Sequence, residues 1–308
     1  MPSKDKWLRA KVPDYILHGI LGSLCQIVYR RKNGTDEPVG TAFVICGSEK
    51  GILCATATHV FTQIASWEND HLASMAGRKR SDLSSAIAEK RIGIVLTDTK
   101  SHIIAPVITA YGSVECDILY FFVEYEPEKR LPPILKKIAI NTDLPEEGQE
   151  VIAVAFHRSK SEKSRTQRTY SHTLDLRKGS VSKVFRKGHN LIKGPCFQTS
   201  IPFAPGMSGG AILMYPSDDT PLAACGVISC DISEPDSQSD GSPGLSFAAL
   251  FWPTLALGFK TNIDGVDQGW MSLMDYIELG RITDIGKERD KITIRRVKEN
   301  VFRVDRKD

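Results

Sequence analysis

One serine, one histidine and one aspartate stand where polar side chains could carry out nucleophilic catalysis. Ser208 lies in the segment PGMSGG, residues 205–210; His59 follows the apolar run 52–57; Asp117 precedes the apolar run 118–123. Hydrolysis of an unactivated amide needs a nucleophile, a base that takes its proton, and a group that orients the base. Ser208, His59 and Asp117 are the candidates for these three roles.

The glycines around Ser208 suit a further requirement of this chemistry. Glycine adopts backbone conformations that are closed to other residues, and it lets a substrate carbonyl approach backbone N–H groups. The N–H groups of Gly206 and Ser208 are therefore candidate donors to a developing oxyanion. Each feature alone has an ordinary explanation as a turn, a core histidine or a capping acid. Their occurrence together, in the order His, Asp, Ser, favours catalysis.

Short strand-like segments separated by turns must position these residues. The turn at Asn33-Gly34 is typical of a hairpin. Many short strands with few long helices predict an all-β barrel or sandwich. The predicted strands are 23–31, 40–46, 52–57, 92–96, 103–110, 118–123, 151–156, 211–214, 223–229 and 245–250.

Other segments do not follow this pattern. Residues 1–20 form a polar lead-in, and the apolar run 16–28 is interpreted as a first strand, because a signal peptide would need a cleavage site that is missing. Residues 62–91 indicate a partly helical insertion. Helices are also expected at 253–259 and 270–279, before a charged tail with strand-like segments at 292–294 and 301–304.

Composition excludes several classes of protein. The 308 residues are 41% hydrophobic and 25% charged, with a net charge of +3, which is typical of a soluble globular chain that needs no polyanionic partner. No apolar stretch reaches 18 residues, so no membrane span is expected. The seven cysteines include no CxxC pair, which fits neither a disulfide framework nor a zinc site. Reduced thiols in a cytoplasmic protein without metal or cofactor are expected.

The chain resembles the trypsin-like (chymotrypsin-fold) serine peptidases over roughly residues 20–260. The resemblance rests on the order of the three residues and on five blocks. Within the family, the serine block is most similar to the HtrA/Deg-like branch. The blocks are 40–45 continuing to His59-Val60, Asp117-Ile118-Leu119, 197–210, Gly226-Val227-Ile228-Ser229 and Leu245-Ser246-Phe247-Ala248.

The resemblance implies two six-stranded antiparallel β-barrels, with short helical insertions and a C-terminal helix. The N-terminal barrel would span about 21–130 and the C-terminal barrel about 131–258, followed by an extension over 259–308. The resemblance also implies a serine endopeptidase in which Ser208 attacks the peptide carbonyl, His59 transfers the proton and Asp117 orients His59. An acyl-enzyme would form on Ser208 and then be hydrolysed.

The sequence departs from the family in ways that narrow the prediction. Met207 stands where secreted members carry an aspartate that pairs with a newly cleaved N-terminus, so no zymogen activation is expected. No cysteine lies where secreted members place their bridges. The 49 residues after 259 are too few for the PDZ domain that HtrA-like enzymes usually append. We therefore expect a stand-alone intracellular peptidase domain.

Substrate preference is weakly encoded. The walls of the primary pocket should come from about 200–204 and 229–231, with Ile201, Phe203, Ser229, Cys230 and Asp231 as candidate substrate-binding residues. The first wall lacks an acid, which favours an apolar side chain, whereas Asp231 would favour a basic one. The expected partners are a protein or peptide substrate and, as an open alternative, a regulatory protein.

A second hypothesis concerns residues 157–195, which hold eleven lysines and arginines against two acids. Solvated loops and a hairpin would explain this composition. The alternative is a protease-fold binding module that uses this basic surface for nucleic acid or an acidic protein. Few aromatic residues lie between the charges, so stacking on nucleic acid is weakly supported.

Overall fold

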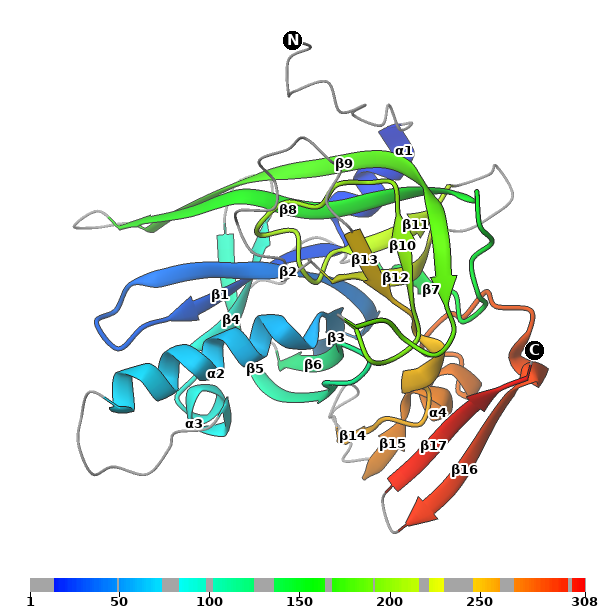
Figure 1. Ribbon diagram of the computed structural model, residues 1–308. Helices are drawn as coiled ribbons and strands as arrows, with labels where there is room; N and C mark the ends of the chain where they lie inside the picture. Colours follow the sequence, from blue (N-terminus) through cyan, green and yellow to red (C-terminus); the bar gives the residue numbers. More distant parts are fainter. Residues whose placement is uncertain are drawn as a thin grey trace.

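The computed structural model describes residues 14–48, 50–73, 83–97, 102–124, 136–163, 168–190, 192–215, 222–229, 246–260, 269–298 and 301–307. Within them, six antiparallel strands close into a first barrel in the order β1-β2-β3-β6-β5-β4 (Figure 1). Pairing of β1 with β4 completes the ring. The strands are β1 (Leu24–Arg30), β2 (Asp36–Gly47), β3 (Gly51–Thr56), β4 (Ile92–Thr97), β5 (His102–Ser113) and β6 (Ile118–Glu124).

A second barrel follows in the chain. Strand β11 pairs with both β8 and β12, which closes a ring of six strands, and β7 (Ala139–Ile140) pairs in parallel with β12. The predicted all-β fold with two six-stranded antiparallel barrels is thus confirmed. The six strands are β8 (Glu150–Lys163), β9 (Arg168–Phe185), β10 (Cys196–Thr199), β11 (Ala211–Met214), β12 (Ala223–Ser229) and β13 (Ser246–Ala249).

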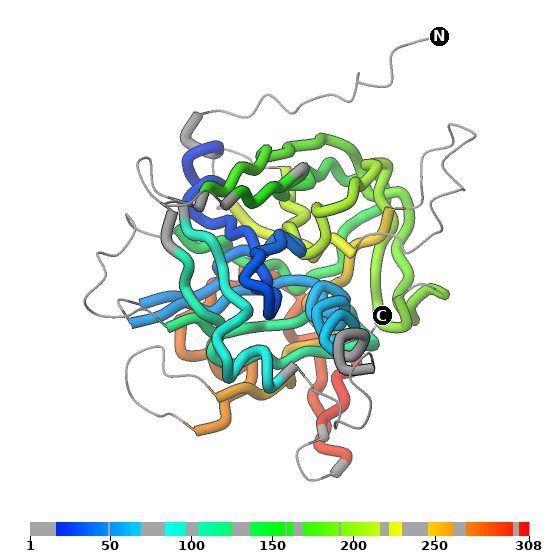
Figure 2. The backbone as a smooth tube through the Cα atoms, turned by 90° about the vertical axis from the view of Figure 1, so that its left-hand side faces the viewer, coloured from blue at the N-terminus to red at the C-terminus, as the bar shows by residue number. Residues whose placement is uncertain are grey.

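Strands β8 and β9 form a long hairpin that leaves the second barrel and crosses over the first (Figures 1 and 2). The Tyr170 hydroxyl donates a hydrogen bond to Asp36, and the Ser159 hydroxyl donates one to Gln26. The sequence predicted a strand only over 151–156 in this region. Cross-strand pairing continues through Lys163 and Arg168, because the ladder depends on the backbone and tolerates polar side chains on its exposed part.

The helices differ from expectation in several places. The apolar run 16–28 is divided between helix α1 (Asp14–Leu21) and β1, rather than forming one strand. Residues 253–259 hold a single 3-10 turn, η2 (Trp252–Thr254), and then strand β14 (Gly258–Lys260). The predicted insertion contains α2 (Thr58–Ala73) and α3 (Leu83–Ala88). None of the helices in the described ranges is long and apolar enough to cross a membrane.

The C-terminal extension packs onto the barrels through its aromatic residues. Phe259 lies 5.9 Å from Tyr120 of β6 and 5.1 Å from Tyr276, measured between ring centroids. The expected helix over 270–279 is strand β15 (Trp270–Ser272) followed by α4 (Leu273–Glu278). A short 3-10 turn, η3 (Arg289–Lys291), leads to the final hairpin of β16 (Ile292–Lys298) and β17 (Val301–Arg306).

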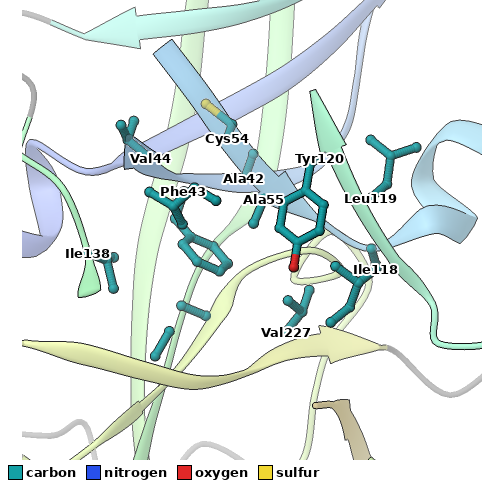
Figure 3. Packing of buried hydrophobic residues seen from close by; sticks show 14 of the residues in the cluster. Ala42, Phe43, Val44, Cys54, Ala55, Ile118, Leu119, Tyr120, Ile138 and Val227 are labelled. Carbon is teal, nitrogen blue, oxygen red and sulfur yellow. The ribbon is translucent and has the colours of Figure 1, made fainter. Parts of the chain in front are cut away.

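A continuous apolar core joins the two barrels. In Figure 3, Phe43 and Tyr120 of the first barrel lie in the same cluster as Val227 of the second. The Tyr120 hydroxyl is 2.7 Å from the Thr254 hydroxyl, so this buried polar group has a partner. The shared core fixes the position of one barrel against the other, and with it the candidate site where they meet.

Candidate active site

His59 and Asp117 lie at the same end of two paired strands. Strand β3 ends just before α2, whose first turn carries His59, and Asp117 immediately precedes β6. Because Thr56 is opposite Leu119 in the β3–β6 ladder, the residues that follow and precede these strands are neighbours. His59 Nδ1 is 2.8 Å from Asp117 Oδ2, and the His59 backbone N–H donates to Oδ1 at 2.9 Å. The carboxylate thus holds both the ring and the backbone of the histidine.

Asp117 itself has an unusual backbone. Its φ is +50°, in the left-handed region that few residues other than glycine, asparagine and aspartate adopt. The Asp117 carbonyl accepts a hydrogen bond from the Thr58 amide at 3.3 Å. Strained backbone of this kind is concentrated at functional sites, where the surrounding structure enforces it.

Ser229 provides a further contact with the carboxylate. Its hydroxyl, buried at the end of β12, donates a hydrogen bond to Asp117 Oδ2. Ser229 was predicted from the sequence to bind substrate, and no local pattern could predict its contact with Asp117, because the two residues are more than a hundred positions apart. The bond links the second barrel directly to the His59–Asp117 pair.

The Ser208 segment lies between β10 and β11 and approaches the chain just before His59. Gly209 has a φ of +82°, and a Cβ there would be 2.0 Å from Thr56 Oγ1 and 3.1 Å from the Ala57 nitrogen. The Ser208 carbonyl accepts a hydrogen bond from the Thr41 amide at 2.8 Å. The absence of a side chain at Gly209 therefore allows the serine segment to lie against the first barrel, beside the turn that carries the histidine.

The amides around Ser208 fall into two groups. Those of Met207, Gly209 and Gly210 donate to the carbonyls of Ala204, Ile228 and Met207. Those of Gly206 and Ser208 donate to no acceptor among the described residues. Within the same part of the chain, no hydrogen bond joins Ser208 Oγ to His59. The two amides predicted as oxyanion donors are thus the ones left available in this turn.

Met207 stabilises the same turn from inside. Its side chain is fully buried, and its sulfur accepts a hydrogen bond from the Ala204 amide at 3.3 Å. The Thr41 hydroxyl donates to the Gly206 carbonyl at 3.2 Å and accepts from the Phe156 amide at 2.9 Å. The turn is thus held by its own buried methionine and by Thr41 of the first barrel, whose hydroxyl is in turn bonded to Phe156 of the second.

The predicted pocket residues have different surroundings. Ile201 is buried, and its side chain packs against Gly179, where a Cβ would be 2.4 Å from Ile201 Cγ1. Phe203 is partly buried, and its amide donates to the Ser246 hydroxyl at 3.1 Å. Cys230 and Asp231 lie outside the described residues, so the preference for an apolar or a basic side chain stays a prediction.

The described ranges also contain cysteines, other possible metal ligands and basic residues. Six cysteines in the described ranges form no disulfide, and burial raises the pKa of Cys196 and of Cys225 to about 12. No group of three or more His, Cys, Asp or Glu side chains there is arranged to hold a metal ion. In the basic stretch, Arg177 pairs with Asp175 and Lys178 pairs with Glu150.

No protein-family model matches the sequence, and no curated protein sequence matches it. A functional proposal must therefore rest on the geometry of the site. The double barrel is consistent with a chymotrypsin-like fold.

Proposed function

We propose that the protein is a serine endopeptidase that hydrolyses peptide bonds of protein substrates through Ser208, His59 and Asp117. The observation that carries the proposal is the 2.8 Å contact between His59 Nδ1 and Asp117 Oδ2. With Nδ1 occupied by the carboxylate, Nε2 is the ring nitrogen left to take a proton from a serine. The neighbouring Ser208 segment, held against the first barrel at Thr41, supplies that serine.

The proposed reaction begins with attack of Ser208 Oγ on the scissile carbonyl, while His59 Nε2 takes the hydroxyl proton. The carbonyl oxygen becomes an oxyanion, which the free amides of Gly206 and Ser208 stabilise. His59 then gives its proton to the departing amine, leaving an acyl-enzyme on Ser208. Water, activated by His59, hydrolyses the ester and restores the serine. Asp117 fixes the histidine tautomer and stabilises its cationic form.

A fluorophosphonate probe tests the nucleophile directly. The wild-type protein should be labelled on Ser208 and should cleave members of a peptide library, and Ser208→Ala should lose both activities. In a triad, loss of the nucleophile costs about 10⁶-fold in turnover. Ser182→Ala is a matched control, because Ser182 is an exposed serine on β9. Its labelling should equal that of the wild type.

Two results would contradict the proposal. One is labelling that persists in Ser208→Ala, which would locate the reactive group elsewhere. The other is a folded wild-type protein that neither reacts with the probe nor cleaves any peptide. If such an inactive wild-type protein also bound nucleic acid with strong dependence on salt, the binding-module alternative would be favoured.

A further inference from the structure

Arg177 of β9 joins the long hairpin to the segment that leads to Ser208. Its Nε and Nη2 donate to Asp175 Oδ2 at 2.8 and 2.6 Å, and its Nη1 donates to the Pro202 carbonyl at 2.5 Å. The side chains of Arg177 and Asp175 are only 15% and 16% exposed. His157 Nδ1 lies 3.8 Å from the same Asp175 oxygen. The guanidinium is thus fixed on one side and bonded to the main chain on the other.

The segment 200–206 depends on such contacts because it is not part of a β-ladder. Pro202 and Pro205 have no N–H group to donate. At its start, the Ser200 amide donates to the Ser180 carbonyl at 2.9 Å. The next residue, Ile201, packs onto Gly179 of β9. Arg177 lies two residues before Gly179 on β9, and it donates a hydrogen bond to the carbonyl of Pro202, the residue after Ile201.

The contact requires an arginine. A planar guanidinium with several donors can engage a carboxylate on one edge and a carbonyl on another, whereas a lysine ammonium is a single point charge. Asp175 and Arg177 are two residues apart on one strand, so their side chains lie on the same face and the carboxylate orients the fork. The nearby ion pair of Lys178 with Glu150 is more exposed, and among the described residues neither side chain forms a hydrogen bond or ion pair with the 200–206 segment.

We propose that Arg177 is a positioning residue for catalysis. Through the Pro202 carbonyl it holds the segment 200–206, which carries the Gly206 amide and leads directly to that of Ser208. The inference rests on the proposed function. Oxyanion donors act on charge that exists only in the transition state, so their displacement lowers kcat more than it raises KM. Misplacement by about 1 Å can cost on the order of 10²-fold. We expect Arg177→Met to lose about 10- to 100-fold in kcat.

The test compares Arg177→Met and Arg177→Lys with Lys178→Met in the full-length protein. For each variant, kcat, KM and the rate of fluorophosphonate labelling are measured on the peptide that the wild type cleaves best. Both Arg177 variants should lose kcat, with little change in KM, and Lys178→Met should match the wild type. Methylguanidinium added to Arg177→Ala at a non-denaturing concentration should restore part of the lost kcat.

The outcomes separate this inference from the proposed function. A wild type without labelling or cleavage would contradict the proposed function. If the wild type is active and the kcat of Arg177→Met lies within about twofold of the kcat of Lys178→Met, the inference is overturned while the proposed function stands. A loss confined to KM would also overturn it, because the contact would then shape only the pocket wall. If Arg177→Met does not fold, Arg177→Lys and the methylguanidinium rescue decide the question.

Discussion

At Gly209 the space for a side chain is occupied by the first barrel. A Cβ would be 2.0 Å from Thr56 Oγ1 and 2.2 Å from the Thr41 carbonyl oxygen, and the φ of +82° is unfavourable for other residues. Both strands that carry these atoms belong to the barrel that holds His59 and Asp117. The glycine is therefore needed for close approach of the serine segment as well as for the turn.

Gly209→Ala should be strongly destabilising and should reduce labelling of Ser208. Left-handed strain of about 1–2 kcal/mol adds to an overpacking cost of about 1–3 kcal/mol. Gly148→Ala is the matched control, because Gly148 has a φ of +87° but no atom within 4 Å of its Cβ position. Urea unfolding of both variants measures the difference. Equal losses would mean that backbone strain alone, without close approach, explains Gly209.

At the scale of elements, helix α2 carries His59 in its first turn and is anchored further along by Glu68. The Glu68 carboxylate accepts two hydrogen bonds from Arg91, at 2.5 and 2.8 Å, and Arg91 also donates to the Tyr29 hydroxyl at 2.8 Å. The Glu68 and Arg91 side chains are 2% and 9% exposed. This buried cluster connects the helix with the strands β1 and β4.

Glu68→Gln should lower the free energy of unfolding by about 3 kcal/mol, because breaking a buried pair leaves a poorly compensated charge. Arg91 keeps its contact with Glu89 in this variant, so the expected loss lies at the lower end of the range for broken buried pairs. Glu89 is 56% exposed, so Glu89→Gln is the control and should cost less than about 1 kcal/mol. Urea unfolding followed by tryptophan fluorescence measures both variants. Similar losses in the two would contradict the role assigned to burial.

Across the whole molecule, buried cysteines lie in apolar surroundings that disfavour their thiolates. Burial raises the pKa of Cys54 and brings the pKa of Cys196 and of Cys225 to about 12. A group whose pKa is higher in the folded state stabilises the fold below its unfolded pKa, and this contribution is lost as pH rises toward the folded value. For Cys196 and Cys225 the window therefore runs from about pH 9 to about pH 12.

The free energy of unfolding should fall as pH rises through this window. Each such thiol contributes about 1.4 kcal/mol of loss per pH unit. Cys225→Ala should show a shallower decline than the wild type, whatever its stability at neutral pH. Urea unfolding at several alkaline pH values measures the slopes, and alkylation of the buried Cys225 should be slow until the protein unfolds. Parallel slopes in the two proteins would refute the assignment to Cys225.

Residue types and their order were enough to predict an all-β fold and to select three candidate catalytic residues. Strand-length apolar runs and turn residues predicted an all-β barrel or sandwich, because local hydrophobic patterns and glycine positions are direct consequences of residue type. The division into two six-stranded barrels was implied by the resemblance to the trypsin-like serine peptidases. The local patterns failed where they were ambiguous. The run 16–28 is mostly apolar, with His18, Ser23 and Gln26 as its polar side chains, and gave no clear period to separate α1 from β1. The hairpin beyond residue 156 is dominated by charged and polar residues.

The distant groups that meet at the site could be identified only from the folded protein. Ser229 donates to Asp117 across the barrels, Thr41 binds the Gly206 carbonyl, and Arg177 binds the Pro202 carbonyl. Each of these contacts depends on strand register and on how the two barrels pack, which no local pattern encodes. Residue types at Ser208, His59 and Asp117 could suggest a chemistry, whereas the geometry that would support it arises from pairs of residues brought together by the complete fold.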